Sequence, residues 1–291
     1  MRLALALLLL LAAQPAFAHD TGGEPHLSGW TWDPWIILPL LVSLILFAAG
    51  WLRLRPRSGI GAGQLRARAA WFAAGWTVLA FALVSPLHQF GEHSFAAHML
   101  EHELLMLAAA PLLVLSRPLA VMLWAFPPGT RRALGAASNV VSPAWHWLTA
   151  PIFATLLQAA ALWLWHAPSL FDRALASETW HAAQHLSFLV SALLFWTAML
   201  ARKTPRGTAA LCLFATSLVS GALGALMAFA ASPWYARYAA LGLAPFGLSP
   251  LEDQQLAGLL MWVPGGMVHA GAALVIIHAL LHQDRELSHA G

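Results

Sequence analysis

The sequence is poor in charge and in cysteine. Only 9% of its 291 residues are charged, whereas about 25% is usual for a soluble domain, and 60% are hydrophobic. This balance excludes an ordinary water-soluble domain. The single cysteine, Cys212, excludes an internal disulfide and any metal site built from several cysteines. The sequence also has no internal repeat, no low-complexity linker and no sign of a second domain.

In place of charge the chain has long apolar runs separated by short polar segments. A run of roughly 18 or more apolar residues is long enough to cross a bilayer as a helix. We therefore predict an all-α polytopic membrane protein, a bundle of about seven transmembrane helices forming one membrane domain over residues 34–291. The segment 116–148 contains PLAVMLWAF, which is too short to span and should extend the third helix or lie at the interface. The expected spans are 34–52, 69–86, 96–115, 149–166, 179–200, 208–231 and 254–282.

The N-terminal stretch MRLALALLLLLAAQPAFA has the plan of a secretory signal peptide. An early Arg2 is followed by an apolar run and a small-x-small ending at Ala18. We predict cleavage after Ala18, leaving residues 19–33 as a short periplasmic segment; the alternative is an uncleaved first span. Cleavage would make His19 the N-terminal residue, whose amine and imidazole could chelate Cu(II) together with His26.

Lys and Arg are distributed unevenly between the two sides of the predicted membrane. All but two of the 15 basic residues fall on one side, leaving Arg173 and Arg237 opposite. Cytoplasmic loops carry the excess of Lys and Arg, so the basic side is predicted to be cytoplasmic. The C-terminus is then cytoplasmic and the mature N-terminus periplasmic. Topology and contact with anionic membrane lipid explain the positive charge without nucleic-acid binding.

Most of the 14 histidines lie at one level of the membrane, near the predicted outer face. His98 and His102 are four residues apart on the third span and so share a helix face. His181 and His185 repeat this spacing at the start of the fifth span, and His166 ends the fourth. Imidazole suits copper, zinc and iron. We predict that these five rings converge on a metal or cofactor site; the alternative is that they pack the helices through ordinary hydrogen bonds.

Four further polar or soft side chains lie on the spans. Met106, one turn after His102, offers a thioether that favours Cu(I). Glu101 is expected to orient a ligating ring as a hydrogen-bond acceptor. Glu103 points away from the histidine face and is expected to interact with the positive end of the helix dipole. His269, deep in the seventh span, is expected to form a hydrogen bond inside the bundle.

Four sequence blocks, HMLEHELLMLAAAPLLVLSRPL, LWLWHAPSLFDRAL, WHAAQHLSFLVSALLFW and DQQLAGLLMWVPGG, occur in this order. They resemble the signature blocks of CtaG-type bacterial cytochrome c oxidase assembly proteins, and the similarity covers roughly residues 70–280. The resemblance implies a seven-span protein of the bacterial inner membrane, needed to form active haem-copper oxidase through copper handling. It also implies that the recurrent histidines of that family fall on His98, His102, His166, His181 and His185.

The leading prediction is an assembly factor, not an enzyme, that binds copper at the periplasmic face through these histidines. As a metal chaperone of the respiratory chain it would help to insert the ion into a cytochrome c oxidase subunit. Three alternatives stay open. One is a redox membrane protein with bis-histidine haem, and another is a metal-free scaffold for oxidase subunits. The third is a copper permease, for which the inner half of the bundle offers only His269, His278 and His282.

Overall fold

The computed structural model describes residues 29–289, with side chains through residue 282. The predicted signal peptide (1–18), its cleavage after Ala18, and the chelating role of His19 and His26 lie outside the described residues. So does most of the predicted periplasmic segment 19–33. These remain predictions of the sequence.

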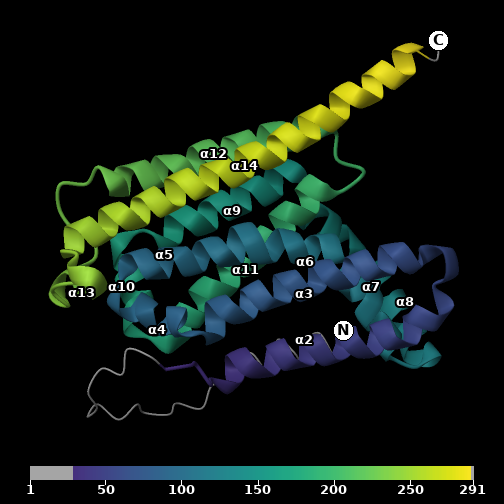
Figure 1. Cartoon of the computed structure of the whole chain (residues 1–291), viewed down its shortest axis with the longest axis horizontal. Coiled ribbons are helices and arrows are strands. Elements are labelled where there is room, and N and C mark those ends of the chain that lie inside the picture. The colour runs from purple at the N-terminus through teal and green to yellow at the C-terminus, as the bar shows by residue number, and fades with distance from the viewer. Residues whose placement is uncertain (1–28, 290–291) are drawn as a thin grey trace.

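Within the described residues every regular element is helical, which confirms the predicted all-α membrane bundle (Figure 1). Six helical segments there are long and apolar enough to cross a membrane, and a bent pair of helices makes a seventh candidate. The six are α2 (Pro34–Leu54), α3 (Ala62–Val84), α5 continued by a π-helical turn and α6 (Phe95–Ser116), α11 (Glu178–Leu200), α12 (Arg206–Ala228) and α14 (Pro250–His289).

Two segments differ from the sequence analysis. The expected fourth span, 149–166, is only α9 (Pro151–Trp165), and it meets α8 (Pro128–Leu148) at 72°. The apolar stretch PLAVMLWAF does not extend the third helix, because α6 ends at Ser116 and Arg117 adopts a left-handed conformation with φ 49°. The stretch instead forms α7 (Pro118–Met122) and a 3₁₀ turn that pack against α2.

The long helices form one bundle (Figure 1). In it α5, α9 and α11 lie between the pair α12 and α14 on one side and the pair α2 and α3 on the other. Further helices close the two ends. One end holds α7 and α8; the other, which we call the α4 end, holds α4 (Pro86–His93), α10 (Pro168–Ala176) and α13 (Ala236–Ala240). Since α5, α11 and α14 all begin at the α4 end, the polar residues of their first turns lie at the same level.

Close contact between α12 and α14 depends on two glycines. A Cβ added to Gly258 would lie 2.5 Å from the carbonyl oxygen of Gly224, and one added to Gly224 would lie 2.7 Å from the carbonyl oxygen of Gly258. Small residues allow such close backbone approach between membrane helices. The approach places the first turn of α14 beside α5.

From that first turn, Asp253 caps the start of α5. Its carboxylate accepts hydrogen bonds from the Ser94 hydroxyl (2.7 Å) and from the backbone N–H groups of Phe95 (2.6 Å) and Ala96 (3.4 Å). The first N–H groups of a helix have no partner within the helix, and here a neighbouring helix supplies the acceptor. Asp253 is buried, so this cap also holds α5 and α14 together.

We expect Asp253→Asn to lower the free energy of unfolding by about 1–3 kcal/mol, because the amide group would face hydrogen-bond donors and leave one of them unpaired. The matched control is Asp33→Asn at the ordinary N-cap of α2, where Asp33 accepts from the N–H of Trp35 and Asn is an equally good cap. Thermal unfolding in detergent measures both changes. Equal melting temperatures for the two variants would contradict this account of the cap.

Candidate metal centre

Two helices present a histidine pair to each other at the α4 end. His98 and His102 on α5 have ring centroids 4.3 Å apart, and His181 and His185 on α11 have the same separation. Across the helix interface, His98 lies 5.2 Å from His181, and His102 lies 4.9 Å from His185. The i,i+4 spacing thus places four of the five predicted rings in one group, which we call the histidine cluster.

Three members of the cluster are close enough to share one ion. One ring nitrogen each from His98, His102 and His185 lies within 4.8 Å of the other two, and all three side chains are buried. Metal–imidazole distances are about 2.0–2.1 Å, so an ion would draw these nitrogens together by about an ångström.

The cluster is rich in unpaired nitrogen atoms. Among the described residues no hydrogen-bond partner reaches Nε2 of His98, His181 or His185, or either ring nitrogen of His102. A buried polar atom without a partner costs about 1–3 kcal/mol. Several such atoms facing one another are what the ligands of a metal ion require, so the residues present fit a metal.

Glu101 lies beneath the cluster and is fully buried. Its Oε1 lies 2.8 Å from Nδ1 of His88 and 3.4 Å from Nδ1 of His185. The contact with His185 is longer than an ordinary N–H···O hydrogen bond, but it places the carboxylate on the Nδ1 side of the ring. There the negative charge favours the tautomer with its hydrogen on Nδ1, which leaves the Nε2 lone pair free for an ion, as where a carboxylate orients a ligating histidine. His88, Glu101 and His185 also form a second group of three possible ligands.

His88 lies on α4, outside the spanning helices. Burial lowers its pKa, but the hydrogen bond to Glu101 and the negative charge of that carboxylate outweigh burial and raise the pKa above the ordinary value. The contact depends on Gly91, since a Cβ there would lie 3.3 Å from Cα of His98. The absence of that Cβ lets α4 approach α5 and bring His88 to Glu101.

His166, the fifth predicted histidine, lies at the margin of the cluster. Its ring centroid is 6.3 Å from that of His102. Nδ1 of His166 donates to the carbonyl of Leu162 (2.7 Å), so Nε2 keeps its lone pair and faces the sulfur of Met99 at 3.2 Å. Two lone-pair donors therefore face each other with no hydrogen between them, and Met99 adds a thioether beside the cluster.

Aromatic side chains enclose these rings. Phe188 lies 4.6 Å from His102, and Phe171 lies 5.3 Å from His98 and 5.8 Å from His166, measured between centroids. Both phenylalanines are fully buried. Such an apolar wall lowers the local dielectric and strengthens electrostatic interactions inside.

Sequence reasoning placed some residues differently. Met106, the predicted accessory ligand, lines a separate cavity deeper in the bundle. Glu103 lines the same cavity and sits in the third turn of α5, beyond the first turn in which the helix dipole acts, so the dipole explanation was wrong. Two residues were missed. His88 lies between the second and third predicted spans, where no helical periodicity indicates which way its side chain points. Nothing in the sequence separates Met99 from a core methionine.

Removing the carboxylate of Glu101 should destabilise the fold even when no metal is bound. We expect Glu101→Ala to lower the free energy of unfolding by about 1–3 kcal/mol, because Nδ1–H of His88 would lose its hydrogen-bond acceptor and Nδ1 of the buried His185 would lose its neighbouring carboxylate. Thermal unfolding in detergent with a metal chelator measures this. Glu92→Gln, at an exposed position of α4, is the control and should melt with the parent. An Ala variant as stable as the parent would show that the carboxylate is not holding the two rings.

The chain is similar to one protein family and to two curated proteins. Residues 45–283 match the family model of the cytochrome c oxidase caa3 assembly factor (Caa3_CtaG). Uncharacterized proteins of Mycobacterium bovis and Mycobacterium tuberculosis are each 28% identical over 274 residues, which is 90% of this chain and 41% of theirs. The chain thus spans about two fifths of the length of these curated relatives. No solved structure matches it.

Proposed function

Because the chain belongs to the family of cytochrome c oxidase caa3 assembly factors, we propose that it assists oxidase assembly by holding a copper ion and passing it to an oxidase subunit. The ion would bind at the histidine cluster, with His98, His102 and His185 as ligands and His181 and His166 beside them. The α4 end of the bundle would then be its periplasmic end. In this role the protein transfers an ion and catalyses no covalent reaction.

The observation that carries the proposal is the set of unpaired, buried ring nitrogens. Packing leaves at least one ring nitrogen of each of the four cluster imidazoles without a hydrogen-bond partner among the described residues. One ion bound by His98, His102 and His185 would satisfy three of these nitrogens at once. Hydrogen bonding between neutral rings would require a donor to face each acceptor. The carboxylate of Glu101, 3.4 Å from Nδ1 of His185, instead favours the tautomer whose hydrogen points away from the cluster.

The choice of copper rests on the donors. Imidazole also suits zinc and iron, whereas a thioether favours Cu(I). Met99 places its sulfur 3.2 Å from Nε2 of His166, at the edge of the cluster. An imidazole–thioether pair with both lone pairs directed inward is a weak, soft site, suited to an ion that must be released again.

Partly exposed histidines adjoin the enclosed ones, which favours exchange of the ion at the surface. His88 retains 13% of its side-chain exposure and His181 is partly exposed, whereas His98 and His102 are fully enclosed. His88 and His181 stack with centroids 5.4 Å apart. His88 and His181 thus lie between the enclosed rings and the surface, where a partner subunit would receive the ion.

The spacing of the rings disfavours bis-histidine haem. A porphyrin between two axial histidines needs an open, wide apolar slot. Here the rings of α5 and α11 pack directly on one another, with His102 and His185 only 4.9 Å apart between centroids. Opening such a slot would require α5 and α11 to separate.

We expect His98→Ala/His102→Ala to weaken Cu(I) binding at the cluster more than about 100-fold, since it removes two ligands, whereas loss of a supporting residue alone typically costs 10–100-fold. The matched control is His278→Ala/His282→Ala, which removes an i,i+4 pair with the same 4.3 Å centroid separation from exposed positions of α14. Competition with a chromophoric Cu(I) chelator, in anaerobic detergent solution, gives both affinities. Equal loss in both pairs, or in neither, would contradict the assignment.

A second prediction concerns assembly in cells. Membranes from cells that lack this protein should contain oxidase with less copper and lower activity per haem, and the parent gene should restore both. The His98→Ala/His102→Ala variant, expressed to the same level, should restore neither. Full restoration by that variant would mean that the protein supports assembly as a scaffold without metal.

A further inference from the structure

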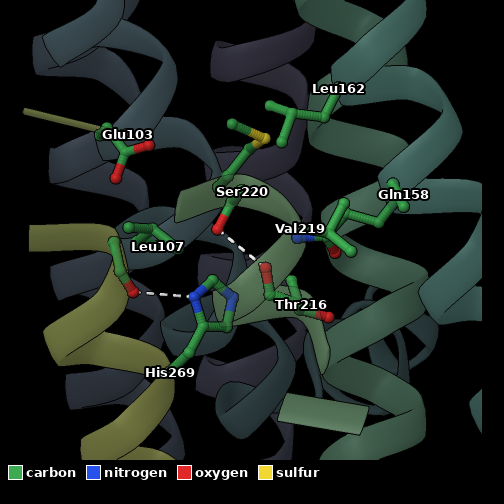
Figure 2. A pocket seen from close by; sticks show the side chains of 11 residues that line it. Glu103, Leu107, Gln158, Leu162, Thr216, Val219, Ser220 and His269 are labelled. Carbon is green, nitrogen blue, oxygen red and sulfur yellow. Dashed lines mark hydrogen bonds between the residues drawn. The ribbon is translucent and has the colours of Figure 1, made fainter. Parts of the chain in front are cut away.

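A second group of polar side chains lies deeper in the bundle, around a small cavity that the histidine cluster does not share. The cavity volume of about 20 Å³ is enough for one water molecule or one bare ion. Its walls come from five segments: α5, the π-helical turn after it, α9, α12 and α14. The polar or soft side chains that line it are Glu103, Met106, Gln158, Thr216, Ser220 and His269, and Figure 2 labels all of them except Met106.

The hydroxyl and imidazole hydrogen atoms of this lining already form hydrogen bonds to backbone carbonyl groups. The hydroxyl of Thr216 donates to the carbonyl of Cys212 (2.9 Å), and that of Ser220 donates to the carbonyl of Thr216 (2.8 Å). Nδ1 of His269 donates to the carbonyl of Gly265 (2.8 Å), which confirms the hydrogen bond expected for this histidine (Figure 2). What these side chains have left to offer is lone pairs.

The atoms without a partner are lone-pair donors as well. Among the described residues nothing pairs with Oε2 of Glu103, Oε1 of Gln158 or Nε2 of His269. His269 is only 2% exposed and Gln158 only 5%. The thioether of Met106 adds a fourth group that accepts but does not donate. Apart from the amide NH2 of Gln158, the lining therefore offers lone pairs, which favours an occupant that brings positive charge.

The charge and the donor types of the lining limit which occupant the cavity can bind. Glu103 is the ionisable acid of the lining, and an unbalanced carboxylate at membrane depth is costly. A monovalent cation balances it. The combination of a thioether with an imidazole nitrogen selects Cu(I) among such cations, because alkali ions prefer oxygen.

The cavity lies about one helical turn beyond the histidine cluster. Met106 follows His102 by four residues, about 6 Å along the same helix, and both side chains are buried. Gly265 on α14 makes room for the acid, since a Cβ there would lie 3.3 Å from Oε2 of Glu103. The cavity therefore lies directly behind the cluster, farther from the α4 end.

We propose that this cavity is a second Cu(I) site, with Nε2 of His269 and the sulfur of Met106 as ligands and Glu103 as the balancing charge. It would hold an ion in reserve behind the outer cluster from which copper is exchanged. The inference deepens the proposed function and rests on copper being the cargo, but its residues are separate from those of the cluster, so the two sites can be tested independently.

The experiment loads the full-length, detergent-purified protein with Cu(I) under anaerobic conditions. Copper per chain is measured by mass spectrometry, and sulfur next to copper by X-ray absorption. The parent should hold two ions. His98→Ala/His102→Ala should keep one, with a sulfur neighbour. Met106→Leu and His269→Leu should each weaken the inner site at least tenfold and keep the outer ion; Met106→Leu conserves volume, so the bundle should remain folded.

Two further variants identify which methionine supplies the sulfur next to copper. Met199→Leu, a buried methionine that does not line the cavity, is the inert control and should bind like the parent. Met99→Leu tests the thioether beside His166. Loss of the sulfur signal in Met99→Leu but not in Met106→Leu would overturn the inner site.

Copper counts separate the two proposals. One ion in the parent and none in His98→Ala/His102→Ala would overturn the inner site and leave the cluster standing. One ion that survives in His98→Ala/His102→Ala but is lost in Met106→Leu and His269→Leu would support the inner site and overturn the cluster. Binding that none of these variants changes, or no binding at all, would overturn both.

Discussion

The cap that Asp253 forms on α5 is the contact on which the candidate site depends. Three donors at the start of α5 converge on one carboxylate from α14, and this fixes where the helix begins. His98 comes one turn later, so its level in the bundle follows from the cap. A shift of even one residue would rotate His98 and His102 by about 100° and turn them away from α11. The close approach of α12 and α14 at Gly224 and Gly258 in turn determines where Asp253 stands.

From that fixed start, α5 carries polar groups along two of its faces. His98 and His102 meet the pair on α11, and Glu101 turns toward α4 and His185. Farther along, Glu103 and Met106 line a cavity together with His269 of α14. Each group is costly inside a membrane bundle unless a partner compensates it. Such groups by default mark function in a membrane protein, and the proposed copper ions would be the partners that compensate them.

Much of the fold could be predicted from the sequence because its signals are local. Apolar length marked the long helices, and i,i+4 spacing marked His98, His102, His181 and His185 as two pairs. The fourth span was less well predicted, since hydropathy cannot register a 72° bend between α8 and α9. Glu103 was misread for a related reason. Its direction on the helix is clear from spacing, but whether that direction meets lipid, a neighbour or a cavity depends on α9, α12 and α14.

The sequence by itself determined the class of the protein, a helical membrane bundle with histidine pairs at one level, because helix length and periodicity depend only on neighbouring residues. Only the tertiary structure decided which side chains meet. It joined His88, 13 residues before Glu101, to the acid beneath the cluster. It moved Met106 out of the cluster and put Met99 beside His166. Contacts between helices arise from packing that brings distant segments together, and no local pattern in the chain records that packing.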